Sequence, residues 1–593
     1  MAETLISPGV LARENDQSFI GGAPVTFGAA IIGPAVKGPV GIPTAVSSYS
    51  QYQAIFGGSV ESGSQFYTYL SSVAANNYFS QGGESLLVTR VVTGSFTGAV
   101  TSGSTAAANN SGIITVGFAN SGGGGPQDLG FEKTSFELTT ISEGTIMNNY
   151  QADDSAGGTL TNGNADNLRW EVGSVNTSSG QFSLVIRRGD DTLKQQSVLE
   201  SYNNVSMDPT ATNYIGAVIG DSYATVESDA GEYFVRTNGS YPNRSAYVYV
   251  SAVNTPTPEY FDNNGTAKDI FTGSLPQVGS GSFTDATGNN FENNDAEFNQ
   301  NITAGNIQGI GPNDYTESIS LLGNKDQYQF NVISTPGLVH TLHPAQVNLV
   351  VNLAQARTDC VSVIDLVTYG ATVNSVVTQA GSFDTSYSAT YWPWLQTIDA
   401  SSGQTVWVPP STYIPGVYAF TDASSDPWFA PAGLIRGSLG SVVRAERQLT
   451  SGNRDSLYEA NVNPIATFPG SGIVVFGQKT LQKKASALDR VNVRRLLISL
   501  KSYISQVSNN LVFEQNTMVT RNNFLAQVNP YLESVQQRQG LYAFKVVMDE
   551  SNNTPDVVDR NQLVGQIFLQ PTKTAEFIIL DFNVLPTGAT FPE

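Results

Sequence analysis

The sequence has few of the residues from which most enzyme active sites are built. Of its 593 residues, one is a cysteine (Cys360), two are histidines (His340 and His343), and only 13% carry a charge. A single cysteine excludes an intrachain disulfide, and so few thiol and imidazole groups leave little for nucleophilic catalysis or proton transfer. Acidic pairs such as Asp153-Asp154 lie in polar stretches that are typical of solvated turns. We therefore expect a protein that is not an enzyme and that holds no metal and no cofactor.

Long apolar runs and excess positive charge are also missing. No stretch of 18 apolar residues occurs, and the first residues lack the basic and apolar segments of a secretory signal peptide. The formal net charge is −21, with 50 acidic residues against 29 basic ones. Phosphate groups and anionic lipid surfaces attract basic faces, so this charge argues against nucleic acid and membranes as partners. We expect a protein that is made and assembled in the cytoplasm and that does not insert into a membrane.

Two short motifs come close to known sites without matching them. His340 and His343 have H-x-x-H spacing, but the glutamate of a metalloprotease helix is missing and Pro344 disfavours such a helix. Residues 472–480 resemble a phosphate-binding loop, but the lysine comes one residue late. The residues between the two glycines also form an apolar strand pattern where free backbone amides are needed. We interpret the histidines as polar loop residues and expect no nucleotide site.

Helical and strand patterns at both ends of the chain predict one core. A chain this long exceeds a single core, so we expect three or four domains. Residues 21–92 have the alternating patterns of a small α/β unit, and 331–574 have those of a larger α/β domain. The larger domain includes a strand at 360–365 and helices at 480–508 and about 517–538.

The middle of the chain differs from both ends. Residues 91–330 contain 26 acidic residues against 9 basic ones and are rich in Gly, Ser, Asn and short β-like runs. This pattern predicts solvent-facing β-rich insertions at 93–199 and 200–330, the second with a polar insertion at 251–330. The expected fold class is therefore α+β and multidomain: an α/β core domain built from N- and C-terminal parts, inserted β-rich outer domains and extended terminal arms.

The two expected arms are residues 1–20 and 575–593. The second contains a strand pattern, Glu576–Val584, whose apolar side chains alternate between two faces. A strand this apolar needs a sheet to join, and a sheet of a neighbouring molecule would make the protein a polymer subunit. For residues 1–20, a frayed terminus is the alternative. The candidate inter-subunit strand residues are Ile6, Val10, Phe577, Ile579, Leu580, Phe582 and Val584.

One basic pattern stands out in this acidic chain. If 480–508 is one helix of 100° per residue, five basic side chains fall within about 60° of each other. They are Lys479, Lys483, Arg490, Arg494 and Lys501. The ridge is either a solvated helix face or a docking surface for an acidic partner.

Several separated motifs follow one another along the chain. They include Ser7-Pro8-Gly9-Val10, Tyr202-Asn203-Asn204-Val205, Tyr391-Trp392-Pro393-Trp394, Val408-Pro409-Pro410-Ser411, Trp428-Phe429-Ala430-Pro431, Gly477-Gln478-Lys479-Thr480-Leu481 and Asn492-Val493-Arg494-Arg495-Leu496. In this order, the motifs resemble the tail sheath proteins of contractile-tailed bacteriophages. The resemblance covers about 1–92, 200–250 and 330–593, and the length and T-even-like layout suggest a large myophage.

The resemblance implies a structural subunit of a virion. Sheath subunits form stacked hexameric rings around a tail tube, exchange terminal arms as added strands, and contract to drive the tube through the host envelope. The implied partners are further copies of the chain, the tail tube protein, and the baseplate and tail terminator proteins. In this setting the basic ridge becomes a candidate tube-facing surface.

Two alternatives remain. One is the sheath of a related contractile injection system, such as a tailocin or a type VI-like machine. The other is a secreted glycan-binding or glycan-active protein housed in 93–330, which would show clustered aromatic residues with paired carboxylates. Tyr214, Tyr223, Tyr241 and Trp170 are scattered through that region without such clustering.

Overall fold

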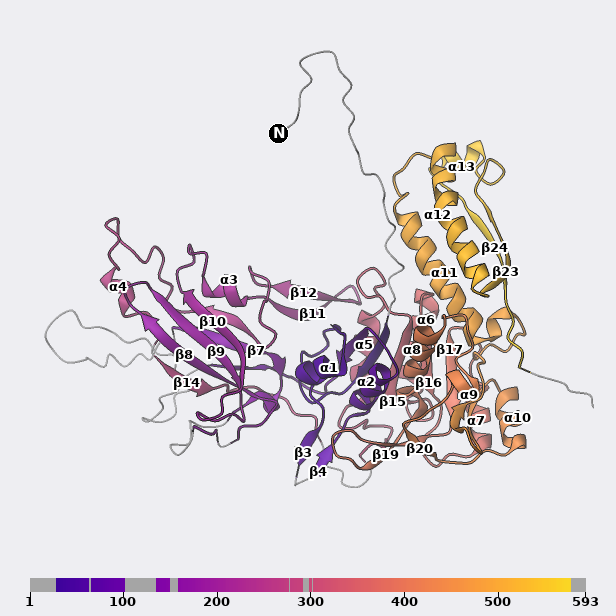
Figure 1. Ribbon diagram of the computed structural model, residues 1–593, viewed down its shortest axis with the longest axis horizontal. Helices are drawn as coiled ribbons and strands as arrows, with labels where there is room; N and C mark the ends of the chain where they lie inside the picture. Colours follow the sequence, from indigo (N-terminus) through magenta and orange to yellow (C-terminus); the bar gives the residue numbers. More distant parts are fainter. Residues whose placement is uncertain are drawn as a thin grey trace, which may run out of the picture.

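The computed structural model describes residues 28–62, 65–101, 135–149, 158–160, 162–276, 278–291, 298–300 and 302–576. These residues form three parts: an outer lobe (98–291), on the left in Figure 1, a central domain (28–90 with 302–490), and a carboxyl-terminal lobe (491–571) that stands above the right half of the central domain in this view. Within the described ranges, no helix combines the length and apolar character that a bilayer crossing requires.

An eight-stranded sheet forms the central domain. Its spatial order is β2 (Thr44–Val46), β5 (Leu86–Arg90), β1 (Ala29–Gly33), β15 (Val332–Val339), β16 (Val361–Asp365), β17 (Ser388–Trp392), β21 (Asn463–Phe468) and β22 (Gly472–Val475). The six inner strands are parallel, and β2 and β22 are antiparallel edges. Because β1 pairs with both β5 and β15, strands about 300 residues apart share one sheet. The inner strands are buried along almost their whole length, as expected when helices cover both faces.

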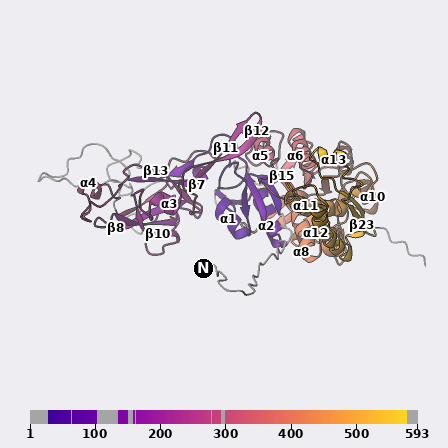
Figure 2. The ribbon, with the colours of Figure 1, turned by 90° about the horizontal axis from the view of Figure 1, so that it is seen from above.

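Helices cover the two faces of this sheet (Figure 2). On one face α2 (Leu70–Ser80) packs with α8 (Ile414–Ser424), beside α1 (Tyr49–Phe56), and on the other α5 (Tyr315–Leu321) packs with α6 (Pro344–Arg357). α7 (Val373–Ala380) and α10 (Ser451–Glu459) pack against each other near β21. Smaller elements border the domain: β3 (Val60–Ser62), β4 (Gln65–Tyr67), β18 (Leu395–Ile398), β19 (Thr405–Val408), β20 (Val442–Ala445) and α9 (Gly433–Arg436).

The outer lobe consists of two antiparallel sheets around one core. One sheet has the order β10 (Val198–Ser206), β9 (Gln181–Arg188), β8 (Leu168–Asn176), β14 (Gly279–Ser282), and the other β13 (Val248–Val253), β7 (Phe136–Glu143), β6 (Gly98–Val100). Trp170, Phe182 and Val250 belong to the same buried cluster. The predicted boundary between 93–199 and 200–330 is therefore wrong, because β10 crosses it and both segments bury side chains together.

The predicted insertion at 200–330 also extends too far toward the carboxyl terminus. Ile307, Ile310 and Tyr315 are buried in the central core, so the part of the chain from 302 to 330 belongs to the central domain. A hairpin of β11 (Tyr223–Asp229) and β12 (Glu232–Asn238) links the two parts, since Val226 and Val235 pack against the central core (Figure 1). The short helices α3 (Ile215–Ile219) and α4 (Asp269–Thr272) lie in the outer lobe.

The carboxyl-terminal lobe is a helical hairpin packed on a strand hairpin. It contains α11 (Val491–Asn509), α12 (Met518–Gln537), β23 (Leu541–Val547), α13 (Pro555–Asp559) and β24 (Gln566–Pro571). The hydroxyl of Thr517 caps α12, and Phe524, Val528 and Leu532 are buried on one face of this helix at a spacing of four residues. The core includes Trp428 from the central domain, so residues 331–574 contain two cores rather than one.

Candidate functional site

The region where an open α/β sheet usually binds a ligand is filled by the chain itself. Such sites lie beyond the carboxyl ends of parallel strands. Here residues 410–412 pack against β15, β16 and β17, and Pro410, Ser411 and Thr412 are all buried. The Asp365 carboxylate, at the end of β16, accepts hydrogen bonds from the Ser411 amide at 3.2 Å and hydroxyl at 2.5 Å. This carboxylate therefore holds a loop in place and does not face a substrate cleft.

Asp365 makes the stability of the central domain depend on pH. Burial raises the pKa of Asp365 to about 7, despite the two hydrogen bonds from Ser411 that lower it. An unfolded aspartate has a pKa of about 3.9. Between these values the folded chain keeps a proton that the unfolded chain has released. The contribution of this group is therefore full below pH 4 and is lost as the pH rises through 7.

We expect the Asp365→Asn variant, which cannot ionise, to be more stable than the parent at pH 8 by up to about 4 kcal/mol. The asparagine carbonyl can still accept from the Ser411 amide. The difference should shrink as the pH falls to 4, where the parent carboxyl is protonated in both states. Melting temperatures of the two proteins at both pH values check this, and a difference independent of pH would contradict it.

The two histidines serve as hydrogen-bonding groups inside the central domain. His340 Nδ1 lies 2.8 Å from Gln379 Oε1, and His343 Nε2 lies 2.9 Å from the carbonyl oxygen of Thr303. His343 Nδ1 accepts from the Val339 amide at 3.2 Å. Both rings thus hold neighbouring segments together, and both residues lie in the loop between β15 and α6, in agreement with their interpretation as polar loop residues.

The predicted basic ridge does not exist as one helix face. α11 begins at Val491, so Lys479, Lys483 and Arg490 precede the helix. Residues 478–491 form a loop whose two ends lie side by side. The Val491 amide donates to the Gln478 carbonyl at 2.8 Å, and the backbones of Lys479 and Arg490 form an isolated antiparallel β-bridge. The helical spacing of apolar residues before 490 was misleading because these tertiary hydrogen bonds outweigh local helix propensity.

Four of the five basic side chains are bound within the chain. Arg494 is 4% exposed and lies 4.0 Å from the ring centre of Tyr387, and burial lowers the pKa of its guanidinium. Arg490 pairs with Glu576, and Lys479 donates to the Tyr458 carbonyl at 2.7 Å. Lys483 is exposed but donates to the Gly381 carbonyl at 2.8 Å, and Lys501 is exposed. A common docking face of five charges is therefore excluded.

The predicted inter-subunit strand residues lie outside the described residues. These are Ile6, Val10, Phe577, Ile579, Leu580, Phe582 and Val584. The structure does describe the chain up to Glu576 and the sheet edges that strands from elsewhere could join.

The carboxyl-terminal lobe presents an open strand hairpin. β23 and β24 pair antiparallel, from Leu541 opposite Pro571 to Val547 opposite Gln566. Within the described ranges they pair only with each other, so each strand keeps one edge without a strand partner. Isolated two-stranded hairpins are marginally stable, and open edges invite further strands. This hairpin is the candidate functional site.

The faces of the hairpin suit added strands. Phe544, Val546, Ile567 and Leu569 point toward α12 but are only partly buried. On the outward face Tyr542 and Phe568 are 64% and 56% exposed. Strands added at the two edges would extend the inner face over the helices and bury more of this apolar surface.

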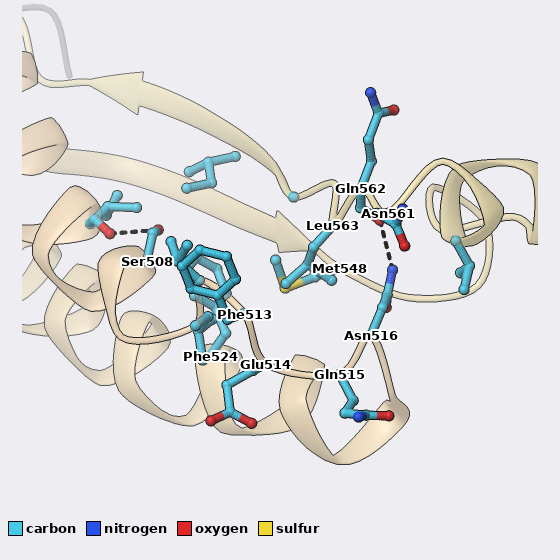
Figure 3. A pocket seen from close by; sticks show the side chains of 16 residues that line it. Ser508, Phe513, Glu514, Gln515, Asn516, Phe524, Met548, Asn561, Gln562 and Leu563 are labelled. Carbon is cyan, nitrogen blue, oxygen red and sulfur yellow. Dashed lines mark hydrogen bonds between the residues drawn. The ribbon is translucent and has the colours of Figure 1, made fainter.

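A cavity of about 880 Å³ lies at the far end of the same lobe (Figure 3). It lies between the loop after α11 and the loop before β24, which are joined where Asn516 donates to the Gln562 carbonyl at 2.8 Å. Its lining combines apolar side chains such as Phe524 and Met548 with amides and one carboxylate, Glu514.

Sequence reasoning missed the hairpin although a signal was present. Residues 541–547 and 566–571 are short runs rich in aromatic and branched apolar side chains, a composition that favours strands. Neither segment is bounded by the short Asn-Gly or Asp-Gly turn that marks a tight hairpin, because 18 residues and α13 separate the strands.

Comparison with known families agrees with this architecture. Residues 308–481 match the central domain of the phage tail sheath protein family, and residues 483–585 match its C-terminal domain. These two adjoining stretches of the chain are therefore similar to two domains of the phage tail sheath proteins.

Individual relatives give the same assignment. The chain is 43% identical over 187 residues to the tail sheath protein of Vibrio phage KVP40 and 38% identical over 187 residues to that of Enterobacteria phage T4. Each alignment covers 32% of this chain and 28% of the relative. The fold is similar to the sheath tail protein of Listeria innocua, with 10% identity, a TM-score of 0.50, and coverage of 92% of this chain and 95% of that one.

Proposed function

We propose that the protein is the structural subunit of a contractile phage tail sheath. The observation that carries the proposal is the match of residues 308–585 to both sheath domains, in a chain whose carboxyl-terminal lobe offers a strand hairpin with two open edges. Its task is mechanical and needs no catalytic residues. The protein acts as a component of the virion tail after assembly in the host cytoplasm.

The arms of neighbouring copies supply the missing strands. Residues 1–20 of one copy and 575–593 of another add to the edges of β23 and β24, with Ile6, Val10 and the alternating residues from Phe577 to Val584 facing the lobe. Main-chain hydrogen bonds suit this contact because they depend little on the side chains and persist while subunits rotate.

The resulting lattice consists of stacked hexameric rings around the tail tube, bounded by baseplate and terminator proteins. The extended lattice is metastable, and contraction buries additional surface between subunits, which drives the tube through the host envelope. The acidic outer lobe, at the opposite end of the molecule from the hairpin (Figure 1), faces outward.

Two truncations test this function. We expect the full chain to form long hollow cylinders in negative-stain micrographs, and chains lacking 1–20 or 577–593 to stay as discrete particles with unchanged melting temperature. Cylinders of normal length from both truncated chains would refute strand exchange. A full chain that stays monomeric under all conditions, including with tail tube present, would refute the sheath assignment.

A further inference from the structure

The side chain of Glu576 is held by donors from three separate segments. Arg490 donates Nε and Nη2 to its two carboxylate oxygens at 2.7 and 2.9 Å, Tyr458 donates its hydroxyl at 2.6 Å, and Gln478 donates Nε2 at 3.1 Å. Tyr458 lies on α10, Gln478 follows β22, and Arg490 precedes α11. Two-point binding of a carboxylate by arginine fixes its orientation as well as its position. We call Tyr458, Gln478 and Arg490 the clasp.

The clasp is joined to the main sheet. Asn463, a fully buried residue of β21, accepts from the Lys479 amide at 2.6 Å and donates to the Lys479 carbonyl at 2.8 Å. Asn463 also donates to the carbonyl of Thr390 in β17 at 3.1 Å. The backbone beside Gln478 is therefore tied to two strands of the central sheet.

Between Thr572 and Glu576 the chain passes from the carboxyl-terminal lobe to the central domain. Thr572, just after β24, donates to the carbonyl of Gly540 in the carboxyl-terminal lobe. Thr574 instead accepts from Gln478 at 2.7 Å, and Glu576 is in the clasp. The segment thus leaves the lobe and is fixed to the central domain before residue 577.

Charge strengthens this attachment. Burial alone would raise the pKa of Glu576, but the hydrogen bonds from Arg490, Tyr458 and Gln478 outweigh it and lower that pKa. The carboxylate is 18% exposed and Arg490 is 25% exposed, so water screens the pair only partly. The Lys479 ammonium lies over the ring of Tyr458, 4.3 Å from the ring centre, in a cation–π contact.

We propose that the clasp fixes the root of the carboxyl-terminal arm to the central domain, so that tension on the arm passes to the main sheet and not to the open hairpin of the same molecule. This proposal rests on the proposed strand exchange. Because the arm of each copy starts from a fixed point, its direction toward the neighbouring hairpin is set before the copies meet. The hairpin, relieved of tension from its own chain, keeps its edges available. Glu576 and the clasp are positioning residues.

The test uses the full chain with Glu576→Gln and Arg490→Gln variants. The matched control is Glu459→Gln, which removes the same charge from an exposed site on α10, beside Tyr458. Spin labels are placed at Ser456→Cys and Ile578→Cys, since the native Cys360 is buried and stays unlabelled. Three quantities are measured: the distance distribution between the labels, the melting temperature, and the critical concentration for cylinder formation.

We expect a narrow distance distribution in the parent and the control, and a broad one in Glu576→Gln and Arg490→Gln. The critical concentration should rise about tenfold in both, as the loss of a charge-assisted contact predicts. The exchanged pair, Glu576→Arg with Arg490→Glu, should restore much of the narrow distribution. A merely structural role would lower the melting temperature without broadening the distribution.

Unchanged distances, or unchanged assembly despite broad distances, would overturn the clasp proposal. The chain ending at Glu576 separates this result from a failure of the proposed function. If that chain forms cylinders, exchange of the carboxyl-terminal strand is itself wrong. If it does not, while Glu576→Gln assembles as the parent does, only the clasp is wrong.

Discussion

The double variant Ile579→Pro with Leu580→Pro is expected to fold normally and to form no cylinders at concentrations where the parent assembles fully. Neighbouring residues of a strand point their amides to opposite edges, so one of the two prolines must remove a donor that faces the neighbouring hairpin. A carbonyl that is left without its donor costs about 1–3 kcal/mol, which corresponds to a rise of about 5- to 150-fold in critical concentration. Sedimentation measures the critical concentration, and negative-stain microscopy shows whether cylinders form.

The control for that variant is Ile579→Val with Leu580→Ile, which keeps both amides and the apolar character. It should assemble within a few-fold of the parent. Normal assembly of the proline variant would show that the arm does not pair through its main chain, even if truncation of the arm prevents assembly.

The Asp191→Ala variant is expected to destabilise the outer lobe by about 3–5 kcal/mol. Asp191 accepts from Arg169 at 3.1 Å and from Arg187 at 2.7 and 2.9 Å, and both arginine side chains are completely buried. Removing the carboxylate takes one charged partner from each of two buried cations, while Arg187 keeps its pair with Glu171. Chemical denaturation and limited proteolysis at 136–206 should both reveal the loss of stability in the outer lobe.

The neighbouring residue offers a matched control. Asp190 pairs with Arg188 at the surface, where the two side chains are 31% and 45% exposed. Exposed pairs contribute about 0–1 kcal/mol, so Asp190→Ala should leave stability almost unchanged. Equal losses in the two variants would show that the buried network does not hold the two-sheet lobe together.

Much of the fold was readable from periodicity. The strands at 86–90 and 361–365 and the helix at 518–537 were expected because each has a strong local pattern of apolar residues. The boundary at 199/200 was wrong because β10 resembles its neighbours in composition. Its place in a sheet depends on pairing with β9, which no local pattern encodes.

For the candidate site too, local patterns predicted some features and the tertiary structure decided others. The apolar alternation from 576 to 584 predicted a strand without a partner, while the open hairpin was recognised only in the folded lobe. The basic ridge failed because helical spacing continues through 481–488 although the backbone there is held in a loop. The partner of Arg490, Glu576, lies 86 residues further along the chain.

The amino-acid sequence by itself determined the α/β core, the acidic β-rich insertion and the resemblance to sheath proteins, because composition and short-range periodicity are local properties. The tertiary structure decided which strands share a sheet, which charges are paired inside the chain and which edges stay open. Those outcomes depend on contacts between residues tens to hundreds of positions apart, and their free energy exists only after the chain has closed the intervening loops.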